Sequence, residues 1–159
     1  MNIRIGFGVD VHRLEEGRDF ILGGVKLPAS YGAVGHSDAD VLIHAICDAL
    51  LGALNLRDIG YHFPDTDPKY KGIDSMRLLE NVMKLVAEKG FVVGNVDATV
   101  ILEQPKVNPH IPSMQNKLAQ LLHVTEDCVS IKATTHEKVD SFGAGEAVKA
   151  YAVCLVVKN

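Results

Sequence analysis

The clearest strand in the sequence reads Ile3-Arg4-Ile5-Gly6-Phe7-Gly8-Val9-Asp10-Val11-His12. Apolar residues hold its odd-numbered positions, which is the period-two pattern of a β-strand. Alternate side chains of a strand share one face, so Asp10 and His12 are expected to project together. The apolar neighbours Val9 and Val11 are expected to point into the core. A carboxylate beside an imidazole suits zinc, although an ordinary Asp–His hydrogen bond at a strand end would use the same pair.

A helix is predicted over residues 38–54, with Ser37 as its N-cap. Asp40, His44 and Asp48 recur every four residues along this helix and therefore line one stripe. His44 then has an acidic neighbour one turn away on each side. Such carboxylates can orient an imidazole that binds a metal.

Three residues of these two elements form a candidate zinc site. Asp10, His12 and His44 would leave zinc one open position, which is typical of a catalytic site, since a structural site is usually closed by four protein ligands. Asp40 is the nearest candidate for a fourth ligand, so a structural site is the alternative. Oxygen and imidazole donors without a thiolate suit a Lewis-acid role.

Further polar segments are candidates for binding a phosphorylated ligand. His36 and Ser37 lie where the predicted helix begins, a place where phosphates bind. Residues 103–106 and 132–138 lie at the ends of predicted strands and carry hydroxyls, lysines and carboxylates, which suit a nucleotide phosphate with a divalent cation. Residues 58–68 are rich in turn-forming and acidic residues and could form a flap over a site or a solvated loop.

The remaining segments predict the fold class. Strands are expected from Phe20 to near Gly23–Gly24 and at residues 92–102, 129–134 and 147–157, and helices at residues 74–89 and from Pro109 or Pro112 to Leu122. This order predicts a single α+β domain over residues 1–159, a mixed β-sheet with helices packed on one face. Residues 150–157 are apolar on both faces, which fits either a subunit interface or a central strand.

Composition narrows the functional classes. The chain has 159 residues, a net charge of −4 and no basic cluster, which argues against a nucleic-acid partner. No segment is long and apolar enough to cross a membrane, and the N-terminus lacks the features of a signal peptide. The 3 cysteines are widely spaced and predict a reducing, cytoplasmic location.

Taken together, these motifs closely resemble the 2-C-methyl-D-erythritol 2,4-cyclodiphosphate synthase family of the non-mevalonate isoprenoid pathway. The resemblance keeps the family's order and covers nearly the whole chain. The matching segments are Gly8–His12, Gly35–Val41 with His44, Asp58–Gly60, Phe63–Pro68, Gly94–Asp97, Pro105–Lys106, Pro109–Pro112, and Lys132–Thr135 with Glu137–Lys138.

The resemblance implies a homotrimer with active sites between neighbouring subunits. The substrate would be the cytidine diphosphate compound 4-diphosphocytidyl-2-C-methyl-D-erythritol 2-phosphate, and the products the cyclic diphosphate and CMP. Its 2-phosphate would attack the β-phosphorus, so the reaction would depend on alignment and charge neutralisation and not on a strong protein base.

The resemblance also assigns roles to residues. Zn²⁺ would be held by Asp10, His12 and His44, and a second divalent cation, Mg²⁺ or Mn²⁺, by Glu137. Catalytic roles would fall to His36, Ser37, Lys132, Thr135 and Glu137. Substrate contacts would come from Asp10, His12, His36, Ser37, Asp58, Ile59, Gly60, Phe63, Asp65, Asp67 and Glu137, and from Pro105, Lys106, Ala133, Thr134 and Thr135 of the adjacent subunit.

Two other functions use the same residues. A two-metal phosphodiesterase or phosphohydrolase would share the ligands but release non-cyclic products. A non-catalytic zinc-binding trimer would use the metal to join strand and helix.

One position departs from the family pattern: Ala144 stands where an arginine is common, at the mouth of a trimer cavity that can hold isoprenoid diphosphates. We therefore expect weak binding of such compounds.

Overall fold

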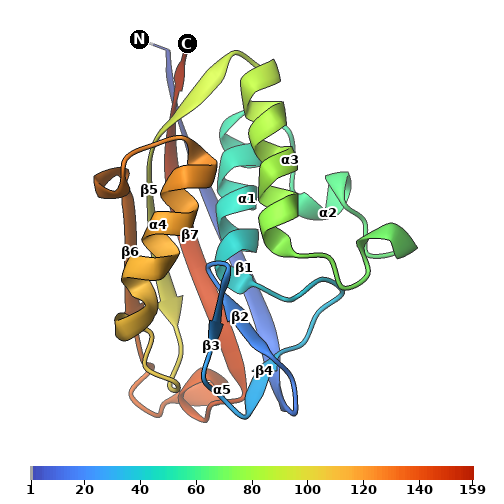
Figure 1. Cartoon of the computed structure of the whole chain (residues 1–159), viewed down its shortest axis with the longest axis vertical. Helices are drawn as coiled ribbons and strands as arrows, with labels where there is room; N and C mark the ends of the chain where they lie inside the picture. Colours follow the sequence, from blue (N-terminus) through green and yellow to red (C-terminus); the bar gives the residue numbers. More distant parts are fainter. Residues whose placement is uncertain (1) are drawn as a thin grey trace.

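A five-stranded mixed sheet forms one layer of the molecule, with the strand order β4-β1-β7-β5-β6 (Figure 1). The strands are β1 (Ile3–Glu16), β4 (Tyr31–Ala33), β5 (Phe91–Ile101), β6 (Val129–Thr134) and β7 (Ala147–Lys158). β5 and β6 are parallel, and the other neighbouring pairs are antiparallel. This computed structural model describes residues 2–159, so Met1 of the predicted domain lies outside the described residues.

Helices cover one face of this sheet, as predicted, which confirms the α+β class (Figure 1). The long helices are α1 (Val41–Ala53), α3 (Ser75–Glu88) and α4 (Ile111–Leu122). α1 packs on β1 and β7 and is itself covered by α3. The shorter elements are the hairpin β2 (Phe20–Leu22) and β3 (Val25–Leu27), the helical turns α2 (Ile59–His62) and α5 (Asp140–Gly143), and the 3₁₀ turns η1 (Pro68–Tyr70), η2 (Asn108–His110) and η3 (Glu126–Cys128).

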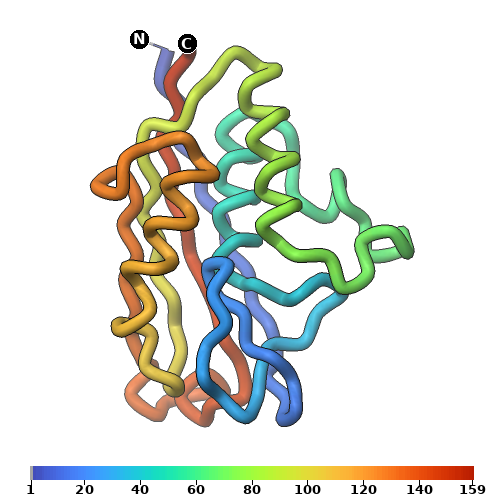
Figure 2. The backbone as a smooth tube through the Cα atoms, viewed as in Figure 1, coloured from blue at the N-terminus to red at the C-terminus, as the bar shows by residue number. Residues whose placement is uncertain are grey.

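The two ends of the described chain lie side by side (Figure 2). The backbone N–H of Lys158 donates to the carbonyl of Asn2 at 2.9 Å. Within residues 2–159, no helix has the length and apolar character that a membrane span requires.

Two glycines of β1 let α1 approach the sheet closely. A Cβ atom at Gly8 would lie 2.0 Å from the carbonyl oxygen of Ala45, and one at Gly6 would lie 1.8 Å from that of Ala49. Only glycine permits this backbone approach. The contact brings α1 directly over β1, so that His44 reaches the strand that carries Asp10.

The prediction that Val9 and Val11 point into the core is wrong. Asp10 and His12 share the helix-covered face with the glycines, which places the odd-numbered apolar residues on the other face. On that face Ile5 is 70% exposed, Phe7 61% and Val11 51%. The alternation defines two faces correctly but does not say which one the helices cover.

The predicted start of the first long helix is also wrong. α1 begins at Val41, and its N-cap is Asp40, not Ser37. Ala39 has a φ of 58°, in the left-handed region, which an α-helix cannot contain. The residues before it, Asp38 among them, therefore belong to a turn.

β1 begins at Ile3 as predicted but continues past His12, the predicted end, to Glu16. The other predicted elements agree with the structure to within about two residues. The strands β2, β5, β6 and β7 and the helices α3 and α4 all lie where the sequence pattern places them. The segment 58–68, predicted as a flap or a solvated loop, instead contains α2 and begins η1. β3, β4 and α5 were not predicted, because elements of three or four residues are too short to show periodicity.

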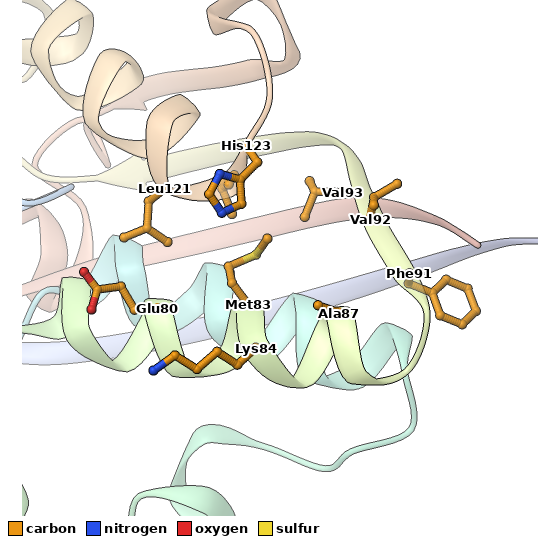
Figure 3. A pocket seen from close by; sticks show the side chains of 10 residues that line it. Glu80, Met83, Lys84, Ala87, Phe91, Val92, Val93, Leu121 and His123 are labelled. Atoms are coloured by element: carbon orange, nitrogen blue, oxygen red, sulfur yellow. The ribbon is translucent and has the colours of Figure 1, made fainter. Parts of the chain in front are cut away.

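A hollow of about 480 Å³ lies between α3, α4 and the start of β5 (Figure 3). Its walls include Met83 and Ala87 of α3, Val93 of β5, and Leu121 at the end of α4. None of the predicted site residues lines this hollow.

Candidate active site

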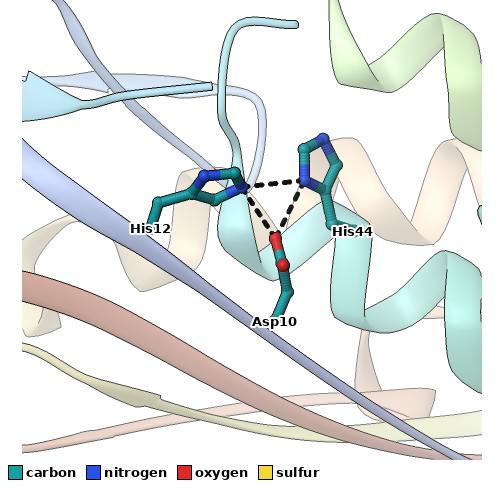
Figure 4. Close-up of side chains that lie close together, drawn as sticks. All are labelled: Asp10, His12 and His44. Carbon is teal, nitrogen blue, oxygen red and sulfur yellow. Dashed lines mark hydrogen bonds and ion pairs between the residues drawn. The ribbon is translucent and has the colours of Figure 1, made fainter. Parts of the chain in front are cut away.

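Three side chains converge where β1 passes beneath α1 (Figure 4). Asp10 Oδ2 lies 2.8 Å from His12 Nε2 and 2.9 Å from His44 Nδ1, and the two nitrogens are 3.2 Å apart. Ligand atoms of a tetrahedral zinc site are separated by about 3.3 Å, because each lies roughly 2.0–2.1 Å from the metal. The three atoms therefore fit around one divalent cation with little movement.

The electrostatics of the cluster favour an ionised carboxylate. Burial alone would raise the pKa of Asp10, but hydrogen bonds and charge attraction from His12 and His44 outweigh it and lower the pKa to about 2. Burial also opposes a charged His12, yet the hydrogen bond that His12 donates to Asp10 and the negative charge of Asp10 raise the pKa of His12. The site thus attracts positive charge, whether a proton or a metal ion.

His12 is oriented by the backbone. Its Nδ1 lies 2.8 Å from the carbonyl oxygen of Val34. A carbonyl only accepts, so Nδ1 donates, and Nε2 is the nitrogen that faces Asp10 and His44. Gly35 makes room for the ring, since a Cβ there would lie 3.0 Å from His12 Cε1.

The two acidic neighbours predicted to orient His44 accept hydrogen bonds from backbone N–H groups instead. Asp40 is fully buried and accepts from the backbone N–H groups of Gly23 at 2.9 Å and Gly24 at 2.7 Å. Asp48 accepts from the N–H of Ile59 at 2.7 Å and so joins α2 to α1. The prediction that Asp40 and Asp48 orient His44 is therefore wrong. The oxygens of Asp40 are occupied by backbone amides, which also removes it as a fourth ligand.

A cavity of about 340 Å³ opens beside the cluster. The predicted site residues that line it are His12, His36, Ser37, His44, Ile59, Gly60, Phe63 and Asp65. Two further predicted residues border it: Asp58 is the N-cap of α2, and the carbonyl of Asp67 lies 3.4 Å from His36 Nε2. One chain thus gathers the three predicted zinc ligands and this half of the predicted substrate contacts.

The other predicted site residues lie across the sheet, at the ends of β5 and β6. Val11 on β1 lies opposite Lys149 on β7. Ile101 on β5 lies opposite Lys149 on its other side, and Thr134 on β6 lies opposite Ile101. Three strand spacings of about 4.8 Å separate the ends of this row by roughly 14 Å. The residues on the far side are Pro105, Lys106, Lys132, Ala133, Thr134, Thr135 and Glu137.

Side-chain contacts on the far side are few. Thr135 donates its hydroxyl to Glu137 at 3.2 Å. Lys132 forms an ion pair with Asp97, which keeps the pKa of that carboxylate below its usual value, chiefly through their hydrogen bond. Both members of the pair lie on the sheet face away from the helices. Within one chain, Lys132 is therefore separated from the metal cluster by the sheet itself.

Ser75 is a polar residue of the site that was not predicted. Ser75, at the start of α3, is fully buried, and its Oγ lies 2.9 Å from His44 Nε2. The sequence gives the position of α3 but no signal that its first residue meets His44, because this contact spans 31 residues. Tyr70, Ile73 and Leu78 also line the cavity and were not predicted.

Comparison with known proteins agrees with this geometry. Residues 3–157 match the YgbB family. The chain belongs to the YgbB family. Among curated YgbB-type relatives, the 2-C-methyl-D-erythritol 2,4-cyclodiphosphate synthase of Porphyromonas gingivalis is 61% identical over 97% of this chain and 95% of its own length.

Solved structures also match over the whole chain. The bifunctional IspDF of Campylobacter jejuni superposes with a TM-score of 0.95 at 38% identity, covering 99% of this chain and 42% of the larger one. The CDP-bound form of a 2C-methyl-D-erythritol-2,4-cyclodiphosphate synthase gives 0.89 at 40% identity, covering 96% of this chain and 99% of that one. The resemblance read from the sequence is thereby confirmed at the level of the family.

Proposed function

We propose that this chain converts 4-diphosphocytidyl-2-C-methyl-D-erythritol 2-phosphate into 2-C-methyl-D-erythritol 2,4-cyclodiphosphate and CMP, as a phosphorus–oxygen lyase of isoprenoid biosynthesis in the cytoplasm. The observation that carries the proposal is the triangle of Asp10, His12 and His44 at the edge of a cavity in a YgbB-family chain. Relatives that share more than half of its residues bear that enzyme's name.

The donor set fits a metal-assisted reaction. Asp10, His12 and His44 would hold Zn²⁺, and Glu137 would contribute to holding Mg²⁺ or Mn²⁺. When bound, these ions supply Lewis-acid neutralisation of the crowded negative charge. Three protein donors are directed at one point, and the described residues offer no fourth. One coordination position would therefore stay open for the substrate, as in catalytic zinc sites.

The protein's own task is alignment. In the proposed step, an oxygen of the 2-phosphate forms a bond to the β-phosphorus, the bond from that phosphorus to the bridging oxygen breaks, and CMP leaves. The attacking phosphate is already ionised at neutral pH, so no protein base is required. His36 and Ser37 would hold the phosphates, and Phe63 with Asp65 would cover the methylerythritol part, because all four line the cavity beside the cluster.

The cytidine side would come from a second copy of the chain, which makes the proposed enzyme a trimer with sites between subunits. The predicted cytidine contacts lie roughly 14 Å across the sheet from the metal cluster of the same chain. The sheet also has an exposed face on which a second subunit could pack. Ile5, Phe7 and Val153 form an exposed apolar face on β1 and β7, which is typical of a subunit interface.

The test is an assay of the products. Incubation with the substrate and Mg²⁺ should release CMP and give the phosphorus NMR signals of a cyclic diphosphate. Non-cyclic phosphate products would assign the chain to the phosphohydrolases that could share these ligands. Zinc binding without CMP release would point to a non-catalytic trimer.

A further inference from the structure

The two histidines of the cluster are oriented in different ways. His12 is fixed by the carbonyl of Val34, whose acceptor character no side-chain substitution changes. His44 Nε2 faces hydroxyl groups instead: Ser75 Oγ at 2.9 Å and Ser37 Oγ at 3.1 Å. A hydroxyl can donate or accept, so these contacts alone leave open whether Nε2 carries a proton, while Nδ1 faces the carboxylate of Asp10 at 2.9 Å.

Asp38 removes that freedom from Ser75. The Ser75 hydroxyl donates to Asp38 Oδ1, and Asp38 also accepts from the backbone N–H groups of Ser75 at 3.0 Å and Asp40 at 3.2 Å. A carboxylate offers only acceptors, and a hydroxyl has a single proton. With its proton committed to Asp38, Ser75 Oγ can only accept from His44.

We propose that Asp38 and Ser75 fix a proton on Nε2 of His44 and thereby turn the lone pair of Nδ1 toward the metal. Asp38 and Ser75 are positioning residues, because neither lies among the atoms that converge on the metal. The inference rests on the metal site of the proposed function and deepens it. It assigns to Asp38, one turn before α1, the role that the sequence pattern had suggested for Asp40 and Asp48.

The geometry suits this role. Ser75 is fully buried, and no buried side-chain polar atom of the described residues lacks a hydrogen-bond partner. The Ser75 hydroxyl is therefore shielded from water, which would otherwise supply an alternative acceptor for its proton. Ser37 cannot take over the function, because its Oγ accepts from the N–H of Ala39 at 3.2 Å while no carboxylate fixes its own proton.

Two variants test the relay. Asp38→Ala removes the carboxylate that holds the Ser75 proton, so that Ser75 can donate to Nε2 and favour a proton on Nδ1. Ser75→Ala removes the link. Each is expected to weaken zinc binding by about 10–100-fold, the usual effect of losing an outer partner of a metal ligand. Ser113→Ala, an exposed serine in the first turn of α4, is the matched control and should bind zinc as the parent does.

Zinc affinity is measured by competition with a chromophoric chelator, and the ¹⁵N spectrum of His44 is recorded on the metal-free proteins. The parent should show a protonated Nε2, and Asp38→Ala an Nε2 without a proton. Unchanged zinc affinity with Nε2 still protonated in Asp38→Ala would overturn the proposal, even if Ser75→Ala were impaired by poor folding.

These readouts do not depend on the substrate. A parent protein that binds zinc but releases no CMP would overturn the proposed function and leave the relay intact. A parent that binds no zinc would also overturn the proposed function, while the ¹⁵N spectrum would still decide the relay.

Discussion

The two sides of the sheet hold very different halves of the proposed site. On the β1 side, three ligand atoms lie within 3.2 Å of one another, and their carriers are half-buried and fixed by hydrogen bonds. On the β6 side, Thr134 and Glu137 are exposed and Thr135 is half-buried, and they have few side-chain partners. The first, called the complete half here, lies within one chain. In the proposed trimer the second, called the open half, becomes a binding surface when another chain supplies the facing half.

His44→Ala removes a ligand from the complete half and should reduce CMP release more than any other variant proposed below. Loss of one of three ligands is expected to reduce CMP release by about 10³-fold or more, because several kcal/mol of charge stabilisation disappear. Zinc content should fall, while the far-UV spectrum and the oligomeric state stay as in the parent. A variant that kept most of its activity would show that the metal assignment is wrong.

Phe7→Asp should dissociate the proposed trimer, and so separate the two halves of the site, without changing a residue of either half. Phe7 stacks on Tyr151 within the exposed apolar face, with ring centroids 6.1 Å apart. A charge there is expected to prevent the subunits from associating, since burying it unpaired costs several kcal/mol per subunit. Light scattering after gel filtration should give a monomer without CMP release. Ser113→Asp, which adds the same charge on the helix side, should stay assembled.

Gly8→Ala tests how the complete half is built. The added Cβ would meet the carbonyl of Ala45, so a loss of about 1–3 kcal/mol in the free energy of unfolding is expected, with weaker zinc binding as α1 moves away. Urea titration measures it. Gly52→Ala is the control within α1, because a Cβ at Gly52 meets nothing within 4 Å, and this variant should be at least as stable as the parent.

Glu137→Gln should affect only the open half. Removing one ligand charge is expected to raise the Mg²⁺ concentration for half-maximal CMP release roughly tenfold, with zinc content unchanged. An unaltered magnesium titration would exclude Glu137 as a ligand of the second cation.

The sequence predicted the three ligands of the metal cluster, but not the residues that orient them. Alternation placed Asp10 and His12 on one face, and helical spacing placed His44 within reach, because both are local periodicities. It failed where the deciding contact is distant along the chain. Ser75 meets His44 across 31 residues, and that link has no local signature.

The wrong predictions have the same origin. Val9 and Val11 were expected in the core because apolar residues usually are, but Gly6 and Gly8 reserve the helix side for the backbone of α1. Ser37 is a good N-cap by residue type, yet the left-handed Ala39 delays the helix by three residues. In both cases a tertiary contact or a single dihedral angle overrides the residue preference.

The trimer and the far half of the site rest on the family resemblance and on the sheet geometry, and they remain predictions. The roles of His36 and Ser37 are also predictions, although the structure places both beside the metal cluster. The expected weak binding of isoprenoid diphosphates, from Ala144, has the same standing.

Mixing two inactive variants tests most directly whether the halves come from different chains. His44→Ala retains the open half, and Glu137→Ala retains the complete half. Co-expressed in equal amounts, they should form mixed trimers in which about a quarter of the interfaces join two intact halves. CMP release should then recover to about a quarter of the parental rate under conditions where each variant alone is inactive. A mixture that is verified to contain both chains in one trimer, yet is no more active than the separate variants, would contradict a site shared between subunits.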